Sequence, residues 1–251
     1  MAATENSTRL AGKAALLAGA SGGIGAATAL RLAQNGVRTL VLSGRDRDKL
    51  DAVAAQVEFA SGAECAVVPA DLTDPAQAAG LMDEAVRLAG GAPDIVVNAA
   101  GVGAIKPVES LTPDDIDALL GINLKGAILL SQSAVRVMAP RRSGHLLHVV
   151  GVLGKAPMAN ASAYCASKYG LAGFLAALRA EVSRRHNLKV TSLFLGGVDT
   201  PFWDNPAVEI KVQRDKMLSP DEAADAILYA LTRPAHLVLG ELTLQPESHQ
   251  L

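Results

Sequence analysis

The chain has 251 residues, of which 50% are hydrophobic and 19% charged, and its formal net charge at pH 7 is -2. Such a composition can bury a large core, and its charge argues against a nucleic-acid partner or an anionic membrane surface, because both favour a basic face. We expect a small-molecule substrate, further copies of the same chain as partners, and no bound metal, because the two cysteines lack metal-ligand spacing. Since the sequence has neither a signal-peptide pattern nor a long apolar run, we expect a cytoplasmic location.

Short apolar runs alternate with helical patterns along the chain, which is the rhythm of a parallel sheet covered by helices. Their continuous apolar character is typical of strands that are buried on both faces. The sequence therefore predicts an α/β fold: one doubly wound Rossmann-like domain over residues 1–251, with a seven-stranded parallel sheet and helices on both faces. The predicted strands are "KAALLAG" (13–19), "RTLVLSG" (38–44), "AECAVVPA" (63–70), "PDIVVNAA" (93–100), "HLLHVVG" (145–151), "LKVTSLFLG" (188–196) and "HLVLGELTL" (236–244).

Three helices are predicted to begin at a capping residue followed by proline, at Asp74, Thr112 and Ser219. The segment "TPFWDNPAVEIKVQRDKML" (200–218) interrupts the alternation with two prolines, an aromatic pair and several charges. Long loops in compact domains are usually functional, so we expect this segment to cover a substrate site. An ordinary long connection is the alternative.

A glycine-rich turn follows the first predicted strand, in "AGASGGIG", where Gly19, Gly23 and Gly25 accompany Ser21 and Ile24. Glycines permit a tight turn and close backbone approach, and the N-terminus of the next helix presents unpaired N–H groups to a pyrophosphate. Between a strand and a helix, this motif predicts a dinucleotide site. A purely structural turn without a ligand is the alternative.

The choice between NAD and NADP is read at the end of the second strand, where NAD sites carry a carboxylate. This chain has Ser43 and Arg45 there, so a 2′-phosphate is favoured and NADP(H) is expected over NAD(H). Alternatively, Arg45 only opens the solvated charge run "RDRDK", and Asp46 or Asp48 takes the ribose hydroxyl. After the third strand, Asp71 is expected to meet the adenine edge, with Leu72 beside it.

Tyr164 and Lys168 stand one helical turn apart at the start of a long predicted helix, so their side chains project from one face. A nearby ammonium favours the phenolate and lowers a pKa that is ordinarily about 10. Tyr164 is therefore predicted to donate or accept a proton near neutral pH. Carbonyl chemistry usually recruits a second hydroxyl, yet residues 148–158 contain no serine, threonine or tyrosine.

Taken together, the glycine turn, "NAAG" (98–101) and the Tyr164-to-Lys168 spacing resemble the classical short-chain dehydrogenase/reductase family over nearly the whole chain. The resemblance implies that Tyr164 is the catalytic acid or base and that Lys168 binds the nicotinamide ribose while lowering the tyrosine pKa. It also implies that Asn123, in "GINLKG", holds a water molecule joined to the lysine. Further cofactor contacts are implied for Asn98, Gly101, Val198 and Thr200, and assembly into a homodimer or homotetramer is expected.

The sequence departs from the family pattern at Ala99, at Leu195 and at Gly151, which stands where the family has its catalytic serine. The missing donor could be supplied by Ser162 or His148, or by ordered water. It could also come from the substrate itself, with glycine making room for a bulky group. The fourth possibility is that the site no longer performs efficient reduction. The alternative for His148 is a satisfied core or interface histidine within the fifth strand. The predicted substrate pocket is apolar and is bordered by Gly151, Val152, Leu153, Met158, Phe202 and Trp203.

These features predict an NADP(H)-dependent oxidoreductase that moves a hydride between nicotinamide and a ketone or secondary alcohol, with the hydride chemistry belonging to the cofactor. Two alternatives remain open: a non-redox step, such as a cyclisation or isomerisation, with Tyr164 as acid, or an NADP(H) sensor without turnover.

Overall fold

The computed structural model describes residues 10–249, and its centre is a seven-stranded sheet in which every neighbouring pair of strands is parallel. The strand order is β3-β2-β1-β4-β5-β6-β7, so the chain runs outward from β1 in one direction and then from β4 in the other. Ligands of such sheets bind at the carboxyl ends of the strands near this reversal. The strands are β1 (Ala14–Ala18), β2 (Thr39–Ser43), β3 (Glu64–Val67), β4 (Ile95–Asn98), β5 (His145–Val149), β6 (Lys189–Leu195) and β7 (Glu241–Leu244).

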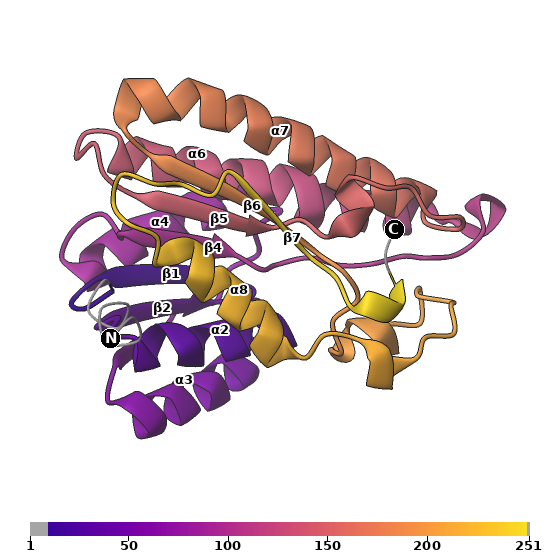
Figure 1. The fold of residues 1–251 in the computed structure, drawn as a ribbon, viewed down its shortest axis with the longest axis horizontal. Coiled ribbons are helices and arrows are strands. Elements are labelled where there is room, and N and C mark those ends of the chain that lie inside the picture. Colours follow the sequence, from indigo (N-terminus) through magenta and orange to yellow (C-terminus); the bar gives the residue numbers. More distant parts are fainter. Residues whose placement is uncertain (1–9, 250–251) are drawn as a thin grey trace.

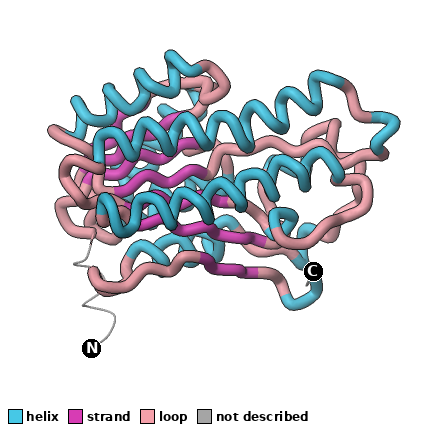
Figure 2. The backbone as a smooth tube through the Cα atoms, turned by 90° about the horizontal axis from the view of Figure 1, so that it is seen from above, coloured by secondary structure: helices cyan, strands magenta, loops and turns pink. Residues whose placement is uncertain are grey.

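Helices cover both faces of the sheet, which confirms the predicted fold class (Figures 1 and 2). Leu17 and Leu16, adjacent in β1, enter separate apolar clusters on opposite faces, as the alternation of side chains along a strand requires. One face carries α2 (Gly23–Gln34), α3 (Arg47–Ser61) and α8 (Pro220–Leu231). The other face carries α4 (Pro75–Ala89), α6 (Ala127–Met138) and α7 (Ser162–His186). The short helix α5 (Pro113–Leu120) leads into α6 through the π-helical turn η2 (Gly121–Gly126).

The three predicted helix starts are confirmed by their hydrogen bonds. The Asp74 carboxylate accepts from the backbone N–H groups of Ala76 and Gln77 at 2.8 and 3.3 Å. Thr112 and Ser219 each form a capping box with the carboxylate three positions on. Capping of this kind fixes the point at which each helix begins, because it satisfies backbone donors that lack an intrahelical partner.

All seven strands are shorter than the runs that predicted them, and the run 93–100 is a strand only over Ile95–Asn98. The run predicted as strand 63–70 is a strand only over Glu64–Val67, and the run 236–244 only over Glu241–Leu244. In the second case Leu237 and Val238 are 47% and 46% exposed, because the chain turns after Pro234 instead of joining the sheet. The apolar composition of the run predicted a buried strand. β7 instead lies at the edge of the sheet, and Leu237 and Val238 before it remain exposed.

Within residues 10–249, one helical stretch, Pro113–Met138, is long and apolar enough to cross a membrane, with a mean hydropathy of 1.4. This stretch spans α5, η2 and α6. Its apolar side chains include Leu130 and Met138, which are fully buried in the cluster beneath α4 and α7. Buried residues make up 44% of the most apolar 18-residue window of this stretch.

Candidate active site

The glycine turn after β1 is built from backbone that leaves no room for side chains. Gly19 has a φ of +79°, and a Cβ there would lie 2.5 Å from the Ala100 nitrogen. A Cβ at Gly25 would lie 2.1 Å from the Gly19 oxygen. The following helix α2 has no side-chain cap and no acidic residue in its first turn, so its first N–H groups are available to an anion.

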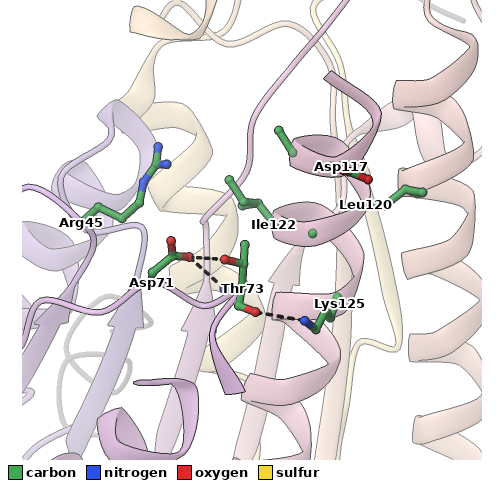
Figure 3. Close-up of a pocket in the computed structure, with 9 residues that line it drawn as sticks. Arg45, Asp71, Thr73, Asp117, Leu120, Ile122 and Lys125 are labelled. Atoms are coloured by element: carbon green, nitrogen blue, oxygen red, sulfur yellow. Dashed lines mark hydrogen bonds between the residues drawn. The ribbon is translucent and has the colours of Figure 1, made fainter. Parts of the chain in front are cut away.

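A cavity of ≈ 180 Å³ lies beside this turn and continues into a second hollow of ≈ 590 Å³. Arg45, Asp71 and Ile122 line both. Figure 3 shows Arg45 and Asp71 across the hollow from Asp117 and Leu120 of α5. Of the predicted cofactor residues, the smaller cavity is lined by Gly19, Ser21, Ser43, Arg45, Asp71, Leu72 and Gly101.

Arg45 and its neighbour Asp46 have different environments. In the part of the chain that the structure describes, the Arg45 guanidinium has no ion pair or hydrogen bond, and it faces the cavities. Asp46 instead caps α3: its carboxylate accepts from the Lys49 backbone N–H at 3.1 Å and pairs with the Lys49 ammonium at 3.2 Å. These hydrogen bonds hold the pKa of Asp46 below its ordinary value. Asp46 therefore has a structural role, while Arg45 is free to meet a ligand.

Asp71 is fixed at the junction of the two hollows. One carboxylate oxygen, Oδ1, accepts from the Thr73 backbone N–H at 2.9 Å and from the Thr73 hydroxyl at 2.8 Å. The Lys125 ammonium donates to the Thr73 carbonyl at 3.1 Å (Figure 3). Because Oδ1 is occupied by Thr73, the other oxygen of Asp71 remains for a ligand in the cavity.

Tyr164 and Lys168 lie in the first two turns of α7, as predicted, and the lysine nitrogen is 5.7 Å from the centre of the tyrosine ring. Lys168 is 4% exposed, and this burial lowers its pKa to about 8. Burial also raises the pKa of Tyr164 above its ordinary value, with a smaller contribution from Cys165. The predicted lowering of the tyrosine pKa is therefore wrong for the protein alone, because the cost of burying a phenolate outweighs the attraction of the lysine.

Asn123 lies in η2 and joins three parts of the site. Its amide oxygen accepts from the Val102 N–H at 2.9 Å, while its amide nitrogen donates to the Val102 carbonyl at 2.9 Å and to the Ser167 hydroxyl at 3.0 Å. The Ser167 hydroxyl in turn donates to the Tyr164 carbonyl at 2.7 Å. Asn123 thus ties the loop after β4 to the turn of α7 that carries Tyr164 and Lys168. Turns of π-helix occur frequently at functional sites.

Gly101 lies between Lys168 and the cavity. It lines the smaller cavity, and a Cβ there would lie 3.2 Å from the Asn123 amide oxygen and 3.5 Å from the Lys168 nitrogen. The cavity therefore ends beside Lys168. The remaining predicted cofactor residues from the turn and the strand ends do not line either cavity. A Cβ at Gly23 would meet Thr200 and one at Gly25 would meet Gly19, while Ile24 and Val198 pack in the core. The Asn98 amide oxygen accepts from the Ala100 N–H at 3.1 Å.

The chain at Gly151 has a φ of +94° and a ψ of 150°, a conformation that is essentially restricted to glycine. A Cβ at this position would lie 3.8 Å from the Tyr164 hydroxyl oxygen. Gly151 therefore borders Tyr164, on a backbone that other residues reach only with strain.

Neither predicted neighbour replaces the serine hydroxyl. His148 is fully buried in β5, with Nδ1 3.3 Å from the Asn98 amide nitrogen and Nε2 3.1 Å from the Ser131 oxygen. Because the Ser131 hydroxyl donates to the Ala127 carbonyl, the network assigns the imidazole proton to Nε2. Burial lowers the pKa of His148 to about 3, with Lys168 adding to the effect. Ser162 is exposed on the first turn of α7.

An apolar cluster surrounds the tyrosine. The Phe202 ring lies 5.9 Å from the Tyr164 ring and 5.1 Å from the Trp203 ring, centre to centre. Of the predicted pocket residues, Val152 instead packs against the cluster beneath α7, because it begins the short helix η3 (Val152–Gly154) on that side. The cluster, hereafter the Tyr164 cluster, comprises Ile105, Leu153, Ala161, Cys165 and Val208, with Met158, Tyr164, Phe202, Trp203 and Ile210 packed against them.

Several residues of the site were missed by the sequence reasoning. Ile105 and Val208 form a parallel bridge that ties the segment 200–218 to the loop after β4, and no local pattern announces this pairing. Ser167 hydrogen-bonds both Asn123 and Tyr164, and its place directly before Lys168 was the only signal. Ile122, which lines both hollows, lies next to Asn123 in the same motif.

The comparisons with known proteins agree with this geometry. The chain is 34% identical over 241 residues to an uncharacterised oxidoreductase of Staphylococcus aureus strain N315, covering 95% of this chain and 99% of the relative. A metagenomic short-chain oxidoreductase solved in complex with NADP has a TM-score of 0.81 and 31% identity, covering 95% of this chain and 99% of that one.

A short chain dehydrogenase of Burkholderia cenocepacia J2315, also solved in complex with NADP, has a TM-score of 0.82 and 30% identity, covering 94% of this chain and 97% of that one. The sequence pattern that describes the short chain dehydrogenases matches residues 13–209, which include the glycine turn, Asn123, Tyr164 and Lys168. The chain therefore belongs to the short-chain dehydrogenase family.

Proposed function

We propose that this protein is an NADP(H)-dependent oxidoreductase that moves a hydride between nicotinamide and the carbon of a ketone or secondary alcohol. One observation carries the proposal: a cavity runs from the unpaired Arg45 past the glycine turn to Gly101, beside the buried Lys168 and its partner Tyr164. The cofactor, when bound, supplies the hydride. The protein supplies positioning, electrostatics and the proton.

The preference for NADP(H) rests on Arg45. A guanidinium without a protein partner can pair with a 2′-phosphate. A carboxylate that binds the free ribose hydroxyl would favour NAD instead, and none of the residues that line the smaller cavity places one beside Ser43 and Gly44. Two relatives of known structure were solved with NADP, which supports the same choice. In this proposal the first N–H groups of α2 bind the pyrophosphate, and Asp71 meets the adenine edge across from Ile122.

Tyr164 exchanges the proton with the substrate oxygen. Lys168 binds the nicotinamide ribose and stabilises the phenolate, while Asn123 positions the turn that carries both and anchors a proton relay. The hydroxyl that serine would give comes from water or from the substrate, because His148 is committed to the core and Ser162 is exposed. Loss of one such donor slows an enzyme by about 10² to 10³ without abolishing its activity.

The segment 200–218 serves as a lid over the substrate. It carries Phe202 to the Tyr164 ring, and the Trp203 indole N–H donates to the Val198 carbonyl at 2.8 Å. Val198 and Thr200 at its root lie beside the start of α2 and complete the nicotinamide end of the site. A lid at this place would exclude water during hydride transfer.

The proposal is tested by following deuterium from NADPH deuterated at both C4 positions into the alcohol products of a panel of ketones. We expect transfer to the carbonyl carbon, and we expect Tyr164→Phe to remove it while leaving NADPH affinity unchanged. Tight NADPH binding without transfer to any ketone would refute hydride transfer and favour a non-redox step or a sensor.

A further inference from the structure

We infer that the substrate is an uncharged, apolar carbonyl compound, and that a carboxylate next to the reacting carbon excludes a molecule from the site. This inference rests on the proposed function, because it takes Tyr164 as the residue that meets the substrate oxygen. It concerns the walls around that residue: the Tyr164 cluster, the loop at Gly151 and the charged groups at their borders.

The first argument is the composition of the wall. Tyr164 packs among apolar side chains, of which Ile105, Leu153, Ala161, Cys165 and Val208 are each at most 8% exposed. The Phe202 ring packs directly on the backbone of Gly103, where a Cβ would lie 2.2 Å from the ring. A substrate that binds here leaves water and contacts an apolar surface, so apolar substituents strengthen its binding.

The second argument is that polar groups near the wall already have partners. The Trp203 indole N–H is used by the Val198 carbonyl, and the Asn205 amide donates to the Gly103 carbonyl at 3.1 Å. The missing serine side chain would have been the remaining donor beside Tyr164. A charged group on the substrate would thus lose its hydration without gaining hydrogen bonds, which is the costly case for burial.

The third argument is the state of the nearby cations. Lys106 pairs with Asp115 at 2.7 Å, and the two side chains are only 11% and 15% exposed. In the lid, the Arg214 guanidinium contacts both Asp199 and Asp204. Each of these cations is neutralised by its own carboxylate, so neither can hold a substrate carboxylate without breaking an existing pair.

Two further lysines border the site. The Lys155 ammonium pairs with Glu241 at 2.7 Å and lies over the Phe194 ring. Lys168 is the cation beside Tyr164, but it stands at the cofactor end, next to Gly101. Two further lysines of the lid, Lys211 and Lys216, have no ion pair within residues 10–249, but their side chains are exposed to solvent rather than buried against the Tyr164 cluster.

The test compares two probes of the same shape, benzoylformamide and benzoylformate, which differ in charge. We expect kcat/KM for reduction by NADPH to be at least about 100-fold higher for the amide, because the carboxylate has no partner in the pocket. Equal values, or a faster acid, would overturn the inference. Failure to reduce any ketone would instead count against the proposed function.

A binding measurement keeps the two failures separate. Trp203 is the only tryptophan of the chain and belongs to the Tyr164 cluster, so its fluorescence reports occupancy of the pocket without turnover. In the NADPH complex, the amide should quench this fluorescence with a dissociation constant at least about tenfold below that of the acid. An acid that binds as tightly as the amide would overturn the inference even if neither compound is reduced.

A pair of variants then tests the mechanism of exclusion. Met158 is half-buried at the border of the Tyr164 cluster, so Met158→Lys can place an ammonium there while its stem stays in contact with the wall. This variant should bind benzoylformate at least about tenfold more tightly than the unmodified protein does. Met158→Leu, of similar volume and no charge, is the matched control and should preserve the preference for the amide. An unchanged acid affinity in a folded Met158→Lys protein would contradict the charge argument.

Discussion

The hydroxyl oxygen of Tyr164 lies 3.8 Å from the point at which a Cβ of residue 151 would stand, so a side chain there would be close to the tyrosine hydroxyl. The natural residue is glycine, with a φ of +94°. The same position thus combines space beside the proton donor with a backbone that side chains resist. A serine at this position would have space for its side chain, but it would strain the backbone.

The first prediction separates these two effects with Gly151→Ser and Gly151→Ala. Both variants should be destabilised by about 1 to 3 kcal/mol, because both place a side chain in a conformation that glycine alone adopts freely. Relative to Gly151→Ala, Gly151→Ser should reduce a small activated ketone with a kcat about tenfold higher or more, the range expected of one added donor. Urea unfolding and steady-state kinetics measure the two quantities.

The alanine variant is the control because it shares the strain and lacks the hydroxyl. Equal rates for the two variants, with the end of β5 unmoved in a crystal structure, would show that a donor at this position does not assist the reaction. A site redesigned for another reaction would then become the better explanation.

The fold and the glycine turn were predictable because both are written in local patterns. Continuous apolar runs marked the strands, and capping pairs such as Ser219 with Glu222 marked helix starts. The pKa of Tyr164 was not predictable, because helical spacing reveals the nearby lysine but not the burial that outweighs it. Likewise, the contact between Ile105 and Val208 joins loops far apart in the sequence, and it exists only through the tertiary structure.

The conformation at Gly151 shows the same limit in another form. A glycine in a sequence states that a positive φ is permitted, but it does not state that the chain adopts one. Val152 was assigned to the substrate pocket because it follows Gly151, whereas the turn η3 directs it to the core beneath α7. Sequence reasoning therefore located the candidate site, and it could not fix the directions of the neighbouring side chains.

The second prediction concerns the pH dependence of catalysis. Burial lowers the pKa of Lys168 to about 8, so the charged form that stabilises the phenolate and holds the ribose is lost as pH rises through 8. The value of kcat/KM, which reports ionisations of the free enzyme, should fall above that pH. Lys168→Arg keeps its charge and should move this limb to higher pH, whatever its effect on the maximum rate. If kcat/KM of Lys168→Arg fell at the same pH as that of the unmodified protein, the titrating group would be a residue other than Lys168.

The third prediction concerns cofactor choice. NADPH should bind more tightly than NADH, and Arg45→Ala should reduce the difference by about 1 to 3 kcal/mol, the scale of a charge-assisted hydrogen bond. Arg47→Ala is the matched control: Arg47 is two positions on, pairs with Asp51 on α3 at 3.6 Å, and does not line either cavity. Titrations of both variants with both cofactors provide the measurement. If Arg47→Ala reduced the preference as much as Arg45→Ala, general positive charge rather than a specific contact would be responsible.

The last prediction concerns stability in acid and rests on His148. Its pKa in the folded chain is lowered to about 3, against an ordinary value of about 6.5, because burial disfavours the imidazolium. As pH falls from about 6.5 toward 3, the unfolded chain binds a proton that the folded chain does not, so the free energy of unfolding must decrease. This histidine contributes a slope of at most about 1.4 kcal/mol per pH unit.

His148→Gln removes the titrating group. It should be less stable than the unmodified protein at pH 7, because Asn98 and Ser131 lose hydrogen-bond geometry in the core, yet its stability should decline less steeply between pH 6.5 and pH 4. His236→Gln, at an exposed position, is the control and should leave the slope unchanged. Free energies of unfolding from urea titrations at intervals of pH measure both slopes. Parallel curves for His148→Gln and the unmodified protein would mean that the imidazole is charged in the fold, which the hydrogen bond from Asn98 to Nδ1 forbids.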